Sequence, residues 1–178
     1  DHRPLKILLI NPPFKNGKFS RTSRSPAITK SGTLYYPIWL AYAAGVLEKE
    51  GFRVKLIDAP AGGLTVKTCV EIARDYKPDL AVIDTSTPSI YSDIEMTALI
   101  KENVKDAFVT LVGTHPSALP HETLELNSSI DAVARGEYDY TIRDLARALA
   151  SDGNLKSVSG ITYRDAAGSI IDNEKRPF

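Results

Sequence analysis

Hydroxyl, glycine and proline residues gather in four short segments, each of which follows an apolar run. These segments are Asn11-Pro12-Pro13, Thr85-Ser86-Thr87-Pro88, Gly113-Thr114-His115-Pro116 and Arg135-Gly136-Glu137. Hydroxyls and free backbone N–H groups beside glycine suit a phosphate or a ligand tail rich in polar atoms. The segments hold no paired acid and base and no spacing typical of metal ligands. They therefore favour binding of a cofactor over catalysis by the protein's own side chains.

Motifs for several common ligands are absent. No Gly-x-Gly-x-x-Gly follows the first apolar run, and no P-loop occurs anywhere in the chain. A flavodoxin-type phosphate loop would stand where Pro12 and Pro13 are found. A phosphoacceptor receiver domain would want acidic residues at the same place and a lysine near Arg135. Asp84 and Thr114 fit a receiver loosely, so a receiver-like signalling module remains an alternative from a different functional class.

The elements that must position these segments alternate between strand and helix. Short apolar runs rich in β-formers predict strands at residues 6–10, 53–58, 79–84, 108–112 and 131–134. Helical spacing of apolar residues predicts helices within 37–51, 66–77, 96–104, 120–127 and 142–149. The apolar stripe of the first helix is predicted to consist of Trp39, Tyr42, Ala43, Val46 and Leu47. Two further strands, 158–164 and 169–172, predict a terminal hairpin. Residues 14–34 are predicted to form a long loop, which in a compact domain is functional or mobile.

Five strand–helix units predict an α/β fold, because right-handed crossovers place helices on both faces of a parallel sheet. The expected architecture is a doubly wound, five-stranded parallel sheet of flavodoxin-like or Rossmann-like type with a C-terminal β-hairpin. Ligands of such sheets bind beyond the carboxyl ends of the strands. All four polar segments are predicted to lie there.

Composition bounds the function class. The 178 residues are 43% hydrophobic and 25% charged with zero formal net charge, which describes a globular domain and excludes a globally basic nucleic-acid binder. Cys69 is the single cysteine, so no disulfide forms within the chain, and helical spacing places it on an apolar stripe. No apolar run approaches the ~18 residues of a membrane span. We expect a cytoplasmic domain excised from a longer protein.

Two features leave alternatives open. Residues 1–36 carry seven basic side chains and one acidic one, clustered at Lys15, Lys18, Arg21, Arg24 and Lys30. This segment is either a solvated loop or a contact for a phosphate or an acidic neighbour. Tyr35, Tyr36 and Trp39 either pack in the core and against loops or form a hydrophobic wall beside a ligand.

Five segments, in order along nearly the whole chain, resemble the N-terminal cobalamin-binding domain of radical S-adenosylmethionine enzymes, a group that includes the anaerobic magnesium-protoporphyrin monomethyl ester cyclases and various methyltransferases. The matching segments are Lys6 to Pro13, Pro37-x-x-Leu40-Ala41-Tyr42-x-Ala44-x-x-Leu47-x-x-x-Gly51 with Val54-x-x-Ile57-Asp58, Leu111 to Leu124, Asp131-x-Val133-x-Arg135-Gly136-Glu137, and Val158-x-Gly160-Ile161-x-Tyr163-Arg164.

The resemblance implies that loops at the carboxyl ends of the strands hold the nucleotide tail and the lower corrin face of cobalamin. Thr85, Ser86 and Thr87 would hydrogen-bond the tail, and Gly113 and Thr114 would line its channel. His115 is either a cofactor contact or a loop histidine bonded to backbone. Arg135, Gly136 and Glu137 would border the tail or corrin edge. Asn11, Pro12 and Pro13 would lie beneath the corrin.

The chain also departs from related patterns. The Asp-x-His-x-x-Gly motif, whose histidine ligates cobalt in other cobalamin domains, is absent, as is the Cys-x-x-x-Cys-x-x-Cys motif of a 4Fe-4S cluster. The resemblance implies that S-adenosylmethionine and the cluster belong to a missing radical domain, the expected partner, and that this chain alone is not catalytic. Residues 1–152 would form the cobalamin domain and 153–178 a hairpin and linker. A purely structural domain without cofactor remains a further alternative.

Overall fold

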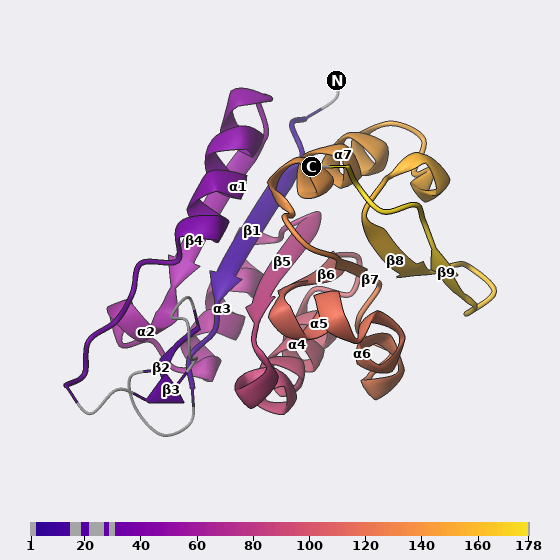
Figure 1. Ribbon diagram of the computed structural model, residues 1–178. Helices are drawn as coiled ribbons and strands as arrows, with labels where there is room; N and C mark the ends of the chain where they lie inside the picture. Colours follow the sequence, from indigo (N-terminus) through magenta and orange to yellow (C-terminus); the bar gives the residue numbers. More distant parts are fainter. Residues whose placement is uncertain (1–2, 15–18, 22–26, 29–30, 178) are drawn as a thin grey trace.

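The computed structural model describes residues 3–14, 19–21, 27–28 and 31–177, and a seven-stranded sheet runs through its centre (Figure 1). The strand order is β4-β1-β5-β6-β7-β8-β9. The first five strands in that order are parallel, and the last two pair antiparallel. The bounds are β1 (Lys6–Asn11), β4 (Arg53–Asp58), β5 (Leu80–Thr85), β6 (Phe108–Gly113), β7 (Ala132–Ala134), β8 (Ile161–Arg164) and β9 (Ile170–Asp172). The predicted fold class is confirmed.

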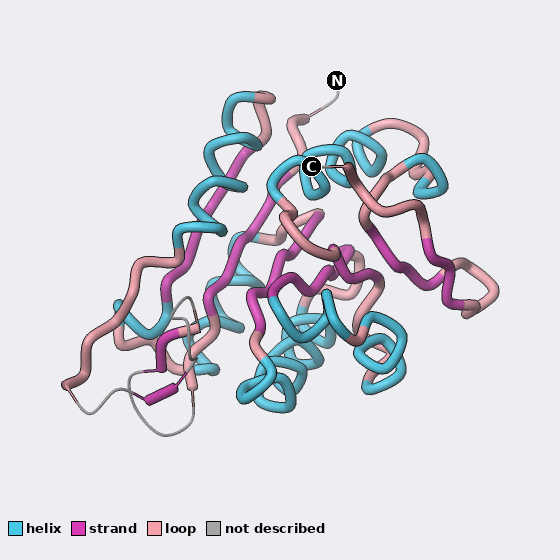
Figure 2. Tube along the Cα trace, viewed as in Figure 1, coloured by secondary structure: helices cyan, strands magenta, loops and turns pink. Residues whose placement is uncertain are grey.

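Helices cover both faces of the sheet (Figure 2). α1 (Ile38–Lys49) and α7 (Asp139–Ala150) pack on one face, and α3 (Val66–Tyr76), α4 (Ile90–Asn103) and α6 (Pro120–Leu126) pack on the other. The short helical elements are α2 (Ala59–Gly62), α5 (Thr114–Ala118), η1 (Thr87–Ser89) and η2 (Leu155–Ser157). The doubly wound arrangement buries one apolar cluster on each side.

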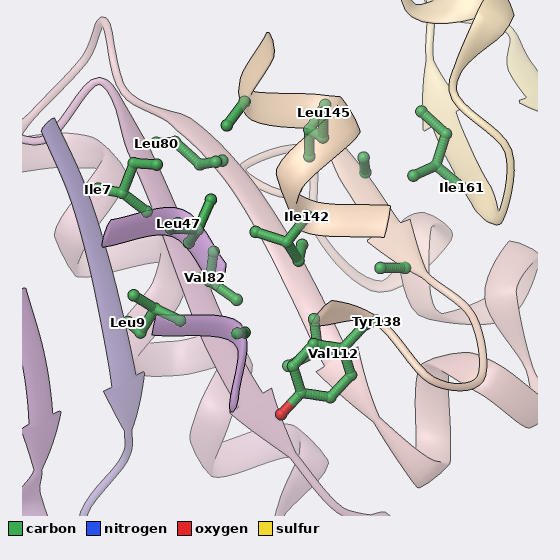
Figure 3. Close-up of a cluster of buried hydrophobic side chains, with 14 of the residues drawn as sticks. Ile7, Leu9, Leu47, Leu80, Val82, Val112, Tyr138, Ile142, Leu145 and Ile161 are labelled. Atoms are coloured by element: carbon green, nitrogen blue, oxygen red, sulfur yellow. The ribbon is translucent and has the colours of Figure 1, made fainter. Parts of the chain in front are cut away.

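β1 shows why the central strands are apolar throughout. Ile7 and Leu9 belong to the cluster under α1 and α7, whereas Leu8 and Ile10 belong to the cluster under α3 and α4. Successive side chains of a strand point to opposite faces, so a strand covered on both faces needs apolar residues at every position. Burying each such side chain contributes about 1.5–3 kcal/mol. Figure 3 shows the first cluster, with Ile7 and Leu9 on β1 and Ile142 and Leu145 on α7.

The orientation of α1 differs from the prediction. Leu40, Ala43 and Leu47 face the sheet and are fully buried, whereas Trp39 and Tyr42 are exposed. The apolar stripe expected to include both aromatic residues is therefore narrower than predicted. Each aromatic directly precedes a buried residue, and neighbouring residues of a helix are turned by about 100°. Of the two readings for Trp39, core packing is wrong.

Three segments predicted as loops contain secondary structure. Two residues of the long N-terminal loop, β2 (Phe19–Ser20), pair antiparallel with β3 (Ala27–Ile28). The turn after β4 is α2, and the segment after β6 is α5. Lys15, Lys18, Arg24 and Lys30 of the predicted basic cluster lie outside the described residues.

The C-terminal hairpin continues the main sheet. Ala132, Val133 and Ala134 of β7 pair with Tyr163, Thr162 and Ile161 of β8, and β9 pairs with β8 in turn. Cys69 is fully buried on α3, as its place on an apolar stripe predicted. Within the described part of the chain, none of the helices is long and apolar enough to cross a membrane.

Candidate functional site

The carboxyl ends of the parallel strands meet at one edge of the sheet, opposite the edge where both chain ends lie (Figure 1). β1 lies between β4 and β5, so the chain leaves β1 toward one side of the sheet and later returns to the other. Such a reversal opens a crevice between the loops that follow the central strands. The four polar segments singled out in the sequence all begin at this edge.

A cavity of about 830 Å³ opens beside this edge, between α1 and the loops after β6 and β7. Its wall combines aromatic residues of α1, small residues at the end of β6 and on α5, and the segment that leads into α7. The lining residues are Trp39, Tyr42, Gly113, Thr114, Ser117, Ala118, Gly136, Glu137, Tyr138 and Asp139. A cavity of this size, with mostly apolar walls and a few polar groups, is typical of a small-molecule or cofactor site.

Gly113 ends β6 at the cavity wall, and only glycine fits there. Its φ of +114° lies in the region that favours glycine. A Cβ atom at this position would stand 2.2 Å from the carbonyl oxygen of Thr85 and 3.2 Å from Oδ1 of Asp84. The glycine thus permits β5 and β6 to stay in register up to the point where the chain turns into the cavity wall.

Ser117 joins the two loops that line the cavity. Its hydroxyl donates to the carbonyl of Gly113 at 2.7 Å and accepts from the backbone N–H of Gly136 at 2.9 Å. The first bond lies within the β6–α5 turn, and the second reaches the loop after β7. Ser117 therefore fixes the spacing between two walls of the cavity.

The aromatic wall has an exposed part and a buried part. Trp39 and Tyr42 are 57% and 54% exposed, and their ring centroids lie 6.1 Å apart. Tyr138 is almost wholly buried, and its hydroxyl has no hydrogen-bond partner among the described residues. Burial, and next the charge of Asp84, raise the pKa of this phenol, which keeps it neutral. Figure 3 places the Tyr138 ring at the edge of the apolar cluster.

Four of the residues predicted from the sequence line the cavity together: Gly113, Thr114, Gly136 and Glu137. The predicted hydroxyls after β5 are divided. Thr85 donates to the carbonyl of Val112 at 2.7 Å, and the Ser86 hydroxyl lies 2.8 Å from that of Ser89. Both residues are buried, whereas Thr87 is exposed. Of these three side chains, that of Thr87 is the one open to a ligand.

The segment after β1 is built into the protein. Asn11 and Pro12 are buried and Pro13 is half-buried. The Asn11 amide donates to Oδ1 of Asp58 at 2.9 Å, and its oxygen accepts from Arg21 at 3.2 Å. This segment can support a ligand from below with Pro13, while Asn11 holds neighbouring strands together.

Two other predicted residues point their side chains elsewhere. Arg135 donates to the backbone carbonyls of Ile161 and Asn173, so its guanidinium holds the hairpin. His115 is half-buried on α5 and does not line the cavity; its Nδ1 is buried without a partner among the described residues. Burial lowers the pKa of His115.

Asp84, predicted as the last residue of a strand, is the fifth residue of β5. Burial raises its pKa to about 7, and the nearby Arg21 guanidinium opposes that rise while Asp93 adds to it. The charge of Asp84 also helps to raise the pKa of Tyr138, so these two polar groups lie near one another at this end of the sheet.

Six residues that line the cavity were not predicted as cofactor contacts: Trp39, Tyr42, Ser117, Ala118, Tyr138 and Asp139. Trp39 was singled out with two open readings, and Tyr42 lies three residues after it. The other four lie one to three residues after His115 or Glu137. The signal that could have found them is proximity to Gly113 and Gly136. Among the described residues, no group of three or more His, Cys, Asp or Glu side chains could hold a metal ion.

Comparisons with known proteins find relatives along almost the whole chain. The chain is 31% identical over 98% of its length to the uncharacterized methyltransferase PH0819 of Pyrococcus horikoshii, and it covers 36% of that protein. It is 27% identical over 90% of its length to the anaerobic magnesium-protoporphyrin IX monomethyl ester cyclase of Cereibacter sphaeroides, of which it covers 25%. The chain thus spans about a third or less of these curated relatives.

Among solved structures, the cobalamin-dependent S-adenosylmethionine radical enzyme OxsB, with aqua-cobalamin and S-adenosylmethionine bound, superposes with a TM-score of 0.80. The alignment covers 98% of this chain and 23% of OxsB at 22% identity, which shows the shared fold. A family model described as the B12 binding domain matches residues 24–146, more than half of the chain and most of the elements that build the cavity. The chain therefore belongs to the B12-binding domain family.

Proposed function

We propose that this domain binds cobalamin at the carboxyl-end loops, with the nucleotide tail in the cavity between α1 and the loops after β6 and β7. The observation that carries the proposal is the cavity itself, whose volume of about 830 Å³ lies at the edge where doubly wound sheets bind ligands. The tail of cobalamin ends in a flat aromatic base. Trp39, Tyr42 and Tyr138 offer aromatic surface to such a base.

Polar groups at the cavity rim suit the rest of the tail. Thr114 and Glu137 line the cavity and are exposed, and Thr87 is exposed on the neighbouring loop. Hydroxyl and carboxylate oxygens can bond the ribose and amide groups of a corrinoid. Gly113 and Gly136 carry no side chains, so the ligand can approach their backbone closely. We assign Thr114 and Glu137 as tail contacts, with Thr87 at the outer end.

The lower face of the corrin would rest on the segment after β1. The sequence has no histidine between Asn11 and Pro37, so that segment supplies no imidazole to cobalt. Pro13 is half-buried there and offers an apolar surface. We therefore propose that cobalamin binds with its own base displaced into the cavity and with no protein imidazole below the metal.

Bound cobalamin supplies a cobalt-centred methyl donor or a redox partner for radical chemistry, and the domain holds it and excludes side reactions. The relatives are several times longer than this chain, and one solved relative carries both cofactors. We propose that the partner is a radical S-adenosylmethionine domain in the same protein, and that residues 153–178 lead toward it. The proposal includes no nucleic-acid partner. The cytoplasm remains the predicted compartment.

Cobalamin retention tests the proposal. The purified chain is incubated with hydroxocobalamin, desalted, and examined by visible absorption. We expect a retained corrin spectrum with base-off features. Complete loss of colour from both the chain and the full-length protein would contradict cobalamin binding and leave a structural domain. Retention by the full-length protein alone would show that the site needs the partner domain.

Trp39 is the single tryptophan of the chain and gives a second measurement. Its fluorescence should be quenched as cobalamin fills the cavity. Replacing Trp39 with Ala should weaken retention by roughly tenfold, because an aromatic wall of the cavity is lost. Leu99→Ala removes an exposed apolar side chain of α4 outside the cavity and serves as the matched control. Equal cobalamin retention by W39A and wild type would show that the nucleotide tail does not bind against Trp39.

A further inference from the structure

Arg21 is buried, although the sequence placed it in a basic segment that is either solvated or in contact with a phosphate or an acidic neighbour. Its Nη2 lies 2.5 Å from Oδ1 of Asp93, and both side chains have 0% exposure. Its Nε lies 3.5 Å from Oδ2 of the same carboxylate. A guanidinium that faces a carboxylate with two nitrogens in a buried site is held in one orientation. Arg21 is therefore neither a solvated side chain nor free to bind a phosphate.

The other side of the Arg21 guanidinium reaches the segment after β1. Nη1 donates to the backbone carbonyl of Pro12 and to Oδ1 of Asn11. Pro12 is buried. One side chain thus joins the end of β1 to Asp93 in the first turn of α4, two elements that are far apart in the sequence.

The environment of Asp93 adds a second tie. Ser89, just before α4, donates its hydroxyl to Oδ2 of Asp93 at 2.6 Å. The Ser89 hydroxyl also lies 2.8 Å from that of Ser86, in the segment after β5. Asp84, at the end of β5, feels the Arg21 charge as well. Arg21 is therefore the counter-ion of Asp93, at the point where the segments after β1 and β5 meet.

We infer that Arg21 is a positioning residue for the proposed cobalamin site: it holds the Asn11-Pro12-Pro13 segment against the start of α4 and does not itself contact the cofactor. The inference rests on the proposed function, because that segment is where the corrin would lie. In this proposal the cavity residues hold the nucleotide tail, whereas Arg21 fixes the position of the segment on which the corrin ring would rest. Lysine cannot replace it, since a single ammonium lacks the fork that spans two partners.

The test must separate positioning from folding. Arg21→Met alone leaves Asp93 buried without a counter-ion, so the deciding variant is the double change R21M/D93L, which replaces the ion pair with apolar side chains. Lys101→Met is the matched control. Lys101 pairs with Asp131 at 2.7 Å and bonds the carbonyl of Ala107, at the opposite edge of the sheet.

Three measurements are made on wild type and on both variants: the melting temperature, amide hydrogen exchange without cofactor, and cobalamin affinity from quenching of Trp39. For R21M/D93L we expect a melting temperature within about 5 °C of wild type. Exchange at Asn11 and Phe14 should speed up by roughly tenfold, with that at Val82 and Leu111 unchanged. Cobalamin affinity should fall by roughly tenfold. K101M should match wild type in exchange at Asn11 and Phe14 and in affinity.

Each other outcome is decisive. Affinity of R21M/D93L within about twofold of wild type would overturn the inference, as would weaker binding without faster exchange at Asn11 and Phe14. If the double variant unfolds while K101M folds, Arg21 serves the stability of the domain and the inference is also overturned. Failure of wild type and full-length protein to bind cobalamin would instead contradict the proposed function, and the exchange result would still report whether Arg21 holds the segment.

Discussion

At the amino end of the sheet, carboxylates are partly exposed and accept hydrogen bonds from strand N–H groups. Asp79, just before β5, accepts from the N–H of Lys6 in β1 at 2.8 Å, and Asp131, just before β7, accepts from that of Val109 in β6 at 2.8 Å. Their cationic partners, Arg3 and Lys101, reach in from the surface. Charge here completes the hydrogen bonding of neighbouring strands.

At the carboxyl end, charge is buried and serves the loops instead. Arg21 and Asp93 are fully buried, and Asp84 lies close to them. The partners of Arg21 are a carboxylate of α4, a backbone carbonyl and a side-chain amide, none of them in the same element as Arg21. Burying these charges costs free energy that a surface pair does not cost. The domain therefore has its costliest polar contacts, the buried charges, at the end of the sheet where we propose that the ligand binds.

Replacing one cation at each end of the sheet tests whether the two ends differ in this way. Arg21→Met should lower the free energy of unfolding by about 3–5 kcal/mol, because it leaves a buried carboxylate unpaired. Lys101→Met should cost about 1 kcal/mol or less, since its pair with Asp131 is partly solvated. Urea unfolding of both variants measures the two values. Equal losses would mean that the two ends do not differ in the way proposed.

The pH dependence of stability should reveal Asp84. Its pKa is about 7 in the folded protein against 3.8 in the unfolded chain, so folding takes up a proton between these values. The free energy of unfolding should therefore fall as pH rises from about 4 to about 7, by at most about 4 kcal/mol.

Asp84→Asn, which does not titrate, isolates this contribution. The difference in unfolding free energy between wild type and D84N should decline from about pH 4 to about pH 7 and then level off. The decline should be steepest between about pH 5 and about pH 6, where the unfolded carboxyl is ionised and the folded one is protonated. Unfolding titrations at several pH values measure it. A difference that stays constant with pH would show that Asp84 is ionised throughout, like an ordinary surface carboxylate.

A smaller effect concerns the backbone of the cavity wall. Gly113→Ala should destabilise the protein by about 3 kcal/mol, because the new Cβ meets the Thr85 carbonyl and the φ of +114° disfavours alanine. Gly153→Ala is the control, with a φ of +71° and no atom within 4 Å of the new Cβ. It should cost about 1 kcal/mol. If both variants unfold at the same urea concentration, the close approach at Gly113 is easily relieved.

Most of the fold could be predicted from the residues. The alternating faces of Ile7, Leu8, Leu9 and Ile10 and the glycine after α1 are local patterns, and they place β1 and α1 correctly. The pairing of Phe19 with Ile28 could not be predicted, because two-residue strands leave no periodic pattern. The turn into α5 was missed for a similar reason, since five residues are too short for a helical repeat.

The site was predicted in outline only. Gly113, Thr114, Gly136 and Glu137 were identified because they follow strands, and the strand ends are readable in the sequence. Their contact with cobalamin, like that of the other residues predicted to touch it, stays a prediction. Trp39 and Tyr42 were placed on the apolar stripe of a helix, but hydrophobic spacing does not say which part of a broad apolar face meets the sheet.

Local sequence patterns suffice to predict the order of strands and helices along the chain and the absence of an imidazole after β1. They also suffice to predict the edge at which we propose that a ligand binds, because each of these features depends on residues close together in the chain. The burial of Arg21 against Asp93, 72 residues away, is seen only in the tertiary structure. The same is true of the cavity that α1 and the segment before α7 enclose. Burial and charge pairing depend on which distant surfaces meet. A basic segment with solvated side chains and one with a buried arginine therefore look alike in the local sequence.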